Sequence, residues 1–196
     1  MTTYTDLQLD ALRELANIGS GTAATSLSGM LGRPVDISVP NPVVLPIPDA
    51  VDAVGPADEE RTAVAIPIVG DMDAVVLLLF DPESAAKLSR LLGVDPDDDM
   101  AISALSEIGN ILGASYVGAI GQMTGMELEP TPPQPARDML GSIMSTVLLM
   151  PGADTEHALL LDTDLTVEGE ECSPSFLFIP SSGGVDELLA RLGLGA

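Results

Sequence analysis

The sequence predicts an α+β fold in which two copies of an α-β-α-β-β-α unit, related by a pseudo-twofold axis, form one six-stranded sheet covered by helices. Three observations predict it: the chain matches itself at a displacement of 93 residues, each copy opens with a long helical pattern, and each continues with apolar runs of strand length. The copies span about 5–93 and 98–193. Because neither half would bury much apolar surface alone, we expect residues 1–196 to be a single domain.

The internal repeat is clearest in polar, glycine and proline positions, where chance matches are least expected. Each pair keeps the same displacement along the chain, and the displacement drifts only toward the ends of the copies. The matched pairs are Asp10 and Ser103, Glu14 and Glu107, Asn17 and Asn110, Gly32 and Gly125, and Pro40 and Pro133.

Each copy is expected to begin with a long helix, over 6–31 and 100–124, because apolar residues recur there at helical spacing. A short strand over 35–39 follows the first helix, and Pro40 and Pro42 should end it. A short amphipathic helix is expected next, over 48–54 and 137–150. Two strands should follow, over 63–69 and 74–80 and again over 158–167 and 175–179, with a hairpin turn at Gly70-Asp71 in the first copy. Each copy should close with a helix, which starts after Asp81 in the first and near Ser181 or Ser182 in the second.

Charge excludes two classes of partner. The chain carries 30 acidic and seven basic residues, a net charge of −23, with Lys87 its one lysine. Such a surface repels nucleic-acid phosphates and anionic lipids, so neither nucleic acid nor a membrane surface is an expected partner. The acidic residues are spread along the chain, which favours adaptation to a very salty cytoplasm over an acidic binding patch, because at about 1 M salt the Debye length is roughly 3 Å.

Several chemistries lack the residues they need. Cys172 alone cannot form a disulfide framework, and the acidic stretch before it should raise the pKa of its thiol. His157 alone supports neither a histidine-based metal site nor a Ser-His-Asp triad. The first residues show no signal-peptide pattern, so a cytoplasmic protein is expected. The apolar segment 101–123 has Glu107 and Asn110 near its middle, which favours a buried helix over membrane insertion.

One polar stripe stands out on each long helix. Glu14 and Asn17 are three residues apart, so their side chains neighbour each other on one face, with Asp10 a turn earlier and Gly21 a turn later. A single pair of this kind is usually just a solvated helix face. Asn is disfavoured in helix interiors, however, and both copies place it at the same point. Duplication alone could still preserve the pattern without function.

The second copy repeats the stripe with Ser103, Glu107, Asn110 and Ala114. The pattern Asp or Ser, x3, Glu, x2, Asn, x22, Pro resembles the signature of the CheC/CheX/FliY chemotaxis phosphatases, and both copies fit it through to Pro40 and Pro133. The segment 14–28, ELANIGSGTAATSLS, is also similar to the first helix of CheC proteins. The resemblance covers nearly the whole chain, and two signatures in fewer than 200 residues favour CheC over CheX and FliY.

The resemblance implies hydrolysis of the aspartyl phosphate of a CheY-type receiver domain. In that reading Asn17 and Asn110 orient the attacking water, while Glu14 and Glu107 pair with the receiver's active-site lysine. Mg²⁺ would belong to the receiver, with no cofactor or metal on this chain. If one pair dominates, Glu107 and Asn110 are favoured, because Ser103 adds no negative charge as Asp10 does. The alternative is a non-catalytic adaptor that binds a receiver or the receptor deamidase CheD.

Overall fold

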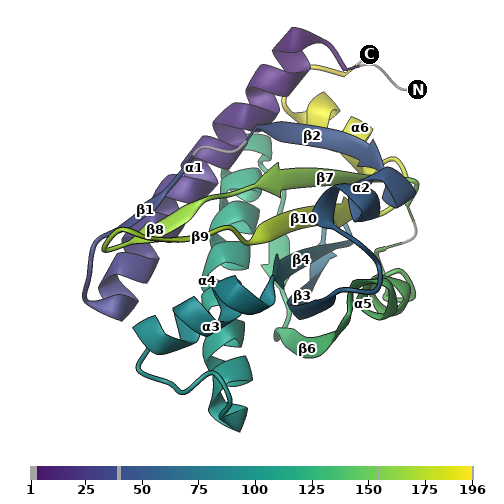
Figure 1. Ribbon diagram of the computed structural model, residues 1–196. Coiled ribbons are helices and arrows are strands. Elements are labelled where there is room, and N and C mark those ends of the chain that lie inside the picture. Colours follow the sequence, from purple (N-terminus) through teal and green to yellow (C-terminus); the bar gives the residue numbers. More distant parts are fainter. Residues whose placement is uncertain (1–3, 39–40, 154, 196) are drawn as a thin grey trace.

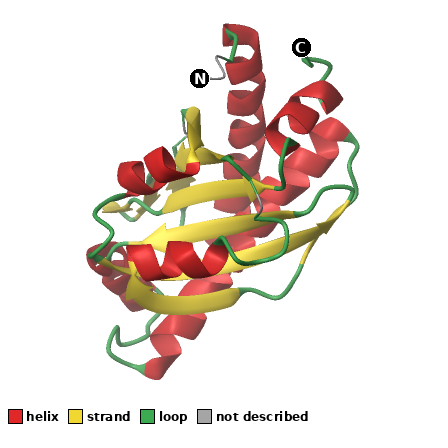
Figure 2. Ribbon diagram, turned by 90° about the vertical axis from the view of Figure 1, so that its right-hand side faces the viewer, coloured by secondary structure: helices red, strands yellow, loops and turns green. Residues whose placement is uncertain are grey.

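The long helices pack together on one face of the main sheet. The structure, a computed structural model, describes residues 4–38, 41–153 and 155–195. Helices α1 (Asp6–Leu31) and α4 (Asp99–Thr124) lie side by side and antiparallel on that face (Figure 1). Helices α2 (Ile47–Val54) and α5 (Leu140–Val147) cover the opposite face, as the turned view shows (Figure 2).

Both long helices begin and end where the sequence predicts, within one residue. Thr5 and Gln8 form a reciprocal capping box at the start of α1, and Asp98 caps α4 by accepting a hydrogen bond from the Met100 amide. Gly32 and Gly125, a matched pair of the repeat, end the two helices in the left-handed conformation with φ of 64° and 71°. The capping residues therefore repeat at the same 93-residue displacement as the helices themselves.

The main sheet combines strands from both copies. The first copy supplies β2 (Pro42–Pro46), β3 (Glu60–Gly70) and β4 (Ala74–Phe80), and the second supplies β5 (Leu128–Pro130), β6 (Gln134–Met139), β7 (His157–Asp162) and β10 (Ser175–Pro180). The order is β2-β7-β10-β4-β3-β5, and β6 also pairs with β3. Each copy therefore lends its outer strand to the other copy's half of the sheet, and β10 and β4 meet at the centre.

The predicted α+β class is confirmed, but the strand count differs. The sheet has six positions, and the sixth is occupied by two strands, so the described residues contain a seven-stranded sheet. Both strands lie along β3: β6 beside residues 60–65 and β5 beside residues 68–70. The interruption falls at Pro132 and Pro133, which have no amide hydrogen to donate to the ladder.

The prediction of one sheet is wrong in a second respect, because the described part of the expected strand, residues 35–38, does not join the main sheet; residue 39 lies outside the described residues. Strand β1 (Val35–Ile37) pairs with β8 (Leu165–Val167), which pairs with β9 (Glu170–Cys172) in a separate three-stranded sheet. The expected strand 158–167 divides into β7 and β8. A two-residue turn joins β8 to β9, with φ of 52° at Glu168 and 85° at Gly169, the signs that a type I′ hairpin turn requires.

Two smaller predictions also need correction. Pro42 begins β2 instead of ending a strand. This is possible because β2 is an edge strand, which among the described residues pairs with β7 alone. The predicted hairpin between β3 and β4 is confirmed, but Gly70 is the last residue of β3 and the loop runs through Asp71–Asp73. The closing helices α3 (Pro82–Leu91) and α6 (Gly184–Arg191) are found close to their predicted starts.

Strand β4 explains why the centre of the sequence is so apolar. All of its residues are buried, because both faces of the central sheet are covered. Val76, Leu78 and Phe80 belong to the core on the α1 and α4 face. The residues between them, such as Leu77 and Leu79, belong to the core beneath α2 and α5. A strand with water on one face would alternate with polar residues instead.

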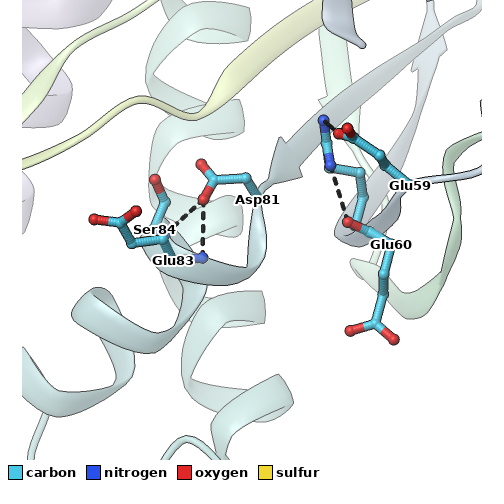
Figure 3. A network of polar contacts seen from close by, with 6 residues as sticks. Glu59, Glu60, Asp81, Glu83 and Ser84 are labelled. Atoms are coloured by element: carbon cyan, nitrogen blue, oxygen red, sulfur yellow. Dashed lines mark hydrogen bonds and ion pairs between the residues drawn. The ribbon is translucent and has the colours of Figure 1, made fainter. Parts of the chain in front are cut away.

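The start of α3 is held by a capping aspartate (Figure 3). The Asp81 carboxylate accepts hydrogen bonds of 2.9 Å from the amides of Glu83 and Ser84. Burial alone would raise the pKa of this carboxyl, but the hydrogen bonds from Ser84 and Glu83, with some attraction to Arg61, outweigh it and lower that pKa. Arg61 itself is nearly buried and donates to the Glu60 carbonyl and the Glu59 carboxylate.

Candidate functional site

The crossing of α1 and α4 fixes the two helices that carry the candidate residues. At Gly19 an added Cβ would lie 2.9 Å from Cε1 and 3.0 Å from Cγ of Tyr116, so only glycine allows this approach. The buried Tyr116 hydroxyl is 2.8 Å from the Ser20 hydroxyl, within hydrogen-bonding distance, and its ring lies 4.4 Å from the ring of Phe176. The contact joins both helices to the sheet.

Helix α4 also approaches β3 closely. An added Cβ at Gly109 would lie 2.8 Å from Val64, and one at Gly113 would lie 2.6 Å from Ile66. Gly109 faces the sheet, and its neighbour Asn110, about 100° further round the helix, is partly exposed. The glycines therefore set how far the second candidate pair stands from the sheet.

The four candidate catalytic residues are accessible. Glu14, Asn17 and Glu107 are exposed, and Asn110 is partly exposed. Within the described residues, none of their side chains takes part in a hydrogen bond or an ion pair with the rest of the chain. Each Glu and Asn is separated by about 4.5 Å along the helix axis, close enough to contact the same region of a partner.

Small residues extend the open surface beyond each asparagine. Gly21 and Ala114, one turn later on α1 and α4, are both exposed. No heavy atom lies within 4 Å of the position that a Cβ would occupy at Gly21. Neither position therefore presents a bulky side chain that would block a partner from reaching the amides of Asn17 and Asn110.

The two pairs form separate sites. Glu14 and Asn17 precede Gly19 on α1, while Glu107 and Asn110 precede Tyr116 on α4. Because the helices run antiparallel, the two pairs lie on opposite sides of the crossing (Figure 1). A partner docked on one pair would therefore contact a different end of the helix layer from a partner docked on the other.

The first pair has an arginine neighbour that sequence reasoning did not single out. Arg13 Nη1 lies 2.8 Å from the Asp10 carboxylate, and Nη2 donates a 3.4 Å hydrogen bond to the Asn41 side chain. The signal was present in the sequence, because Arg13 follows Asp10 by three residues and precedes Asn17 by four, the helical neighbour spacings.

This ion pair bears on the choice between the sites. Asp10 does add a negative charge, but Arg13 offsets it, whereas the second copy has the neutral Ser103 and Ser106 at the equivalent positions. Both stripes therefore carry one net negative charge. The electrostatic reason for favouring Glu107 and Asn110 no longer holds.

Of the two signature prolines, the structure describes one. Pro133 is partly buried in the connection between β5 and β6. Its counterpart Pro40 lies outside the described residues. Each proline follows the last residue of its long helix by nine positions in the sequence (31 to 40, 124 to 133), and Pro133 directly precedes β6.

Other candidate chemistries have no support in the geometry. Cys172 is buried, and burial is the main reason that the pKa of its thiol is raised to about 11. Neighbouring acids such as Asp81, the kind of cause that the sequence indicates, raise this pKa by a smaller amount. Across the described part of the chain, no group of three or more His, Cys, Asp or Glu residues is placed to hold a metal ion. None of the described helices has the length and apolar character needed to cross a membrane.

Comparison with known proteins decides the family. A family model described as "CheC-like family" matches residues 7–44 and 100–134, two segments whose starts are 93 residues apart. The chain is 31% identical over 196 residues to a Bacillus subtilis protein named "CheY-P phosphatase CheC", covering 95% of this chain and 94% of that protein. The chain belongs to the CheC-like family.

Two further similarities extend this result. A Halobacterium salinarum protein named "Putative CheY-P phosphatase CheC1" is 27% identical over 172 residues, covering 84% of this CheC-like chain and 86% of that protein. The crystal structure of Thermotoga maritima FliY matches with a TM-score of 0.76 at 20% identity, covering 98% of both chains. The second similarity confirms that the fold is of the CheC and FliY type.

Proposed function

We propose that this CheC-like protein hydrolyses the aspartyl phosphate of a CheY-type response regulator at two sites, one on α1 and one on α4. The observation that carries the proposal is that the side chains of both Glu/Asn pairs are at least partly exposed and make no hydrogen bond or ion pair within the described residues. Relatives of the chain are named "CheY-P phosphatase CheC" and "Putative CheY-P phosphatase CheC1". Side chains held for packing would be buried or bonded within the fold.

In the proposed reaction the asparagine amide positions a water molecule. The carbonyl oxygen of Asn17 or Asn110 accepts a hydrogen bond from the water, whose oxygen then attacks phosphorus in line with the aspartyl oxygen. The phosphorus–oxygen bond to the aspartate breaks, and the products are the free aspartate carboxylate, inorganic phosphate and a proton. An amide is too weak a base to remove the proton early, so its contribution is orientation.

The glutamate has a docking role in this proposal. Glu14 or Glu107 would pair with the receiver's active-site lysine, which sets the register of the helix over the phosphoryl group. The charge balance of the receiver's phosphate, including its Mg²⁺, remains with the receiver, so the helix contributes one carboxylate and one amide. Truncating one partner of a close pair that docking desolvates costs about 2–5 kcal/mol of binding.

The test is phosphate release from a CheY-type receiver charged with acetyl phosphate, measured with and without this protein at molar salt. We expect acceleration by the wild-type chain, and partial activity in Asn17→Ala and in Asn110→Ala because each leaves one pair intact. Gln122→Ala, an exposed position on the same helix as Asn110, is the matched control and should keep full activity. Release at the receiver's own rate in the presence of the wild-type chain would refute the proposal. Tight receiver binding without turnover would instead favour the adaptor alternative, with CheD as the other expected partner.

A further inference from the structure

Each candidate site begins with an exposed apolar side chain that the fold does not use. Leu7 on α1 and Met100 on α4 are each 64% exposed, and neither belongs to a core cluster. They stand at equivalent positions, 93 residues apart, and both are the second residue of their helix. Of the seven large apolar residues that are exposed in the described part of the chain, these two are the pair that the repeat relates.

Both side chains lie on the same helix face as the Glu/Asn pairs. Leu7 precedes Glu14 by seven residues and Met100 precedes Glu107 by seven, which is two helical turns and returns to nearly the same direction. The distance along the axis is about 10.5 Å. A partner whose interface buries about 800 Å² on each protein would contact both the apolar side chain and the glutamate of one helix.

Divergence between the copies shows which features of the stripe were kept. The polar residues between the apolar position and the glutamate differ: Asp10 and Arg13 in the first copy stand where Ser103 and Ser106 stand in the second. Leu7 and Met100 differ in identity but both are large and apolar. Helix capping does not account for them, because Thr5 and Asp98 provide the caps.

We propose that Leu7 and Met100 are docking residues, which insert into an apolar patch of the phosphorylated receiver beside its phosphorylation site. This inference rests on the proposed function and adds a specificity contact to the same two sites. The partner is a receiver whose surface pairs an apolar patch with the phosphoryl group, about two helical turns apart. Because the contact forms equally in the ground state and the transition state, it lowers KM without raising kcat.

The experiment isolates one site at a time. In an Asn110→Ala background only the α1 site can turn over, and Leu7→Ser is expected to raise KM about tenfold, equivalent to about 1.4 kcal/mol, while kcat stays within about twofold. Leu7→Met should keep the wild-type KM. Leu149→Ser in the same background is the matched control, because it removes an apolar side chain that is 87% exposed and belongs to neither site, and it should leave KM unchanged. The reciprocal set uses Asn17→Ala with Met100→Ser.

A second readout separates this proposal from the proposed function. The dissociation constant of a beryllofluoride-charged receiver is measured for the wild type, for Leu7→Ser with Met100→Ser, and for Leu149→Ser, which removes an apolar side chain that is 87% exposed elsewhere. Weaker binding by Leu7→Ser with Met100→Ser, together with unchanged binding by Leu149→Ser, supports docking even if the wild type proves unable to hydrolyse the phosphate. Unchanged binding and unchanged KM overturn docking while hydrolysis stands. No receiver binding by the wild type overturns both proposals.

Discussion

Replacing Gly19 by alanine tests whether the α1–α4 crossing depends on the absence of a side chain at that point. The new methyl group would lie 2.9 Å from Cε1 of Tyr116. This ring cannot move freely, because it is buried, packs against the ring of Phe176 and shares a hydrogen bond with Ser20. Gly21 is the matched control: it lies in the same helix with no atom within 4 Å of its added Cβ, and Ala114 already occupies the equivalent position.

The magnitudes follow from two opposing terms. Alanine is favoured over glycine in a helix by about 1 kcal/mol, so Gly21→Ala should stabilise the fold by about that amount. Overpacking a closed core costs about 1–3 kcal/mol, and we expect about 2–3 kcal/mol here because burial, Phe176 and Ser20 all restrain the ring. After the helix-propensity gain of about 1 kcal/mol is subtracted, Gly19→Ala should destabilise the fold by about 1–2 kcal/mol. The two variants should therefore differ by about 2–3 kcal/mol, or about 5–10 °C in melting temperature for a chain of this size.

The assay is urea unfolding at molar salt, followed by circular dichroism, with the slope m compared between variants. A double-mutant cycle with Tyr116→Leu identifies the cause, because a smaller side chain at 116 should recover most of the loss from Gly19→Ala. If Gly19→Ala proves as stable as Gly21→Ala, or if Tyr116→Leu does not alter its cost, the helices do not meet at this contact and the reasoning fails.

Three further changes have signs fixed by the structure. Asp81→Ala removes the cap of α3 and should lower the free energy of unfolding by about 1 kcal/mol at neutral pH. Because folding lowers the pKa of Asp81, the carboxylate stabilises the fold above the ordinary carboxyl pKa, and this stabilisation disappears as the pH falls through the folded-state pKa. Urea titrations across pH should therefore show a smaller stability difference between the variant and the wild type in acid. Gly169→Ala should cost about 1–2 kcal/mol through its φ of 85° alone, since the site is open, and an equal melting temperature would contradict this. Lowering salt from the molar range to about 0.01 M lengthens the Debye length from roughly 3 to 30 Å; with a net charge of −23 the protein should lose circular dichroism signal, and an unchanged spectrum would contradict the halophile interpretation.

The helices were more predictable than the strands for a physical reason. Helix bonds are local, so apolar spacing and the caps Asp98, Gly32 and Gly125 specify α1 and α4 without knowledge of the rest of the chain. The strands that pair with each other, by contrast, lie far apart in the sequence. The exchange of β2 and β6 between the copies leaves no local pattern, and the prolines of β2 argue against a strand until it is known to lie at an edge.

The candidate site shows the same division. Glu14, Asn17, Glu107 and Asn110 could be placed on common helix faces from spacing alone, and the structure shows them accessible. Their catalytic roles remain predictions. The contact between Gly19 and Tyr116 could not be predicted, because it depends on which faces of two distant helices meet.

The measurement that tests the central claim most directly compares turnover and binding in one variant, Asn17→Ala with Asn110→Ala. If the amides orient water, kcat for phosphate release should fall by about 100-fold or more while the dissociation constant of a beryllofluoride-charged receiver stays close to that of the wild type. Glu14→Ala with Glu107→Ala should weaken that binding as well, because it removes the charge pair to the receiver lysine. Full phosphate release by the double asparagine variant would contradict the account.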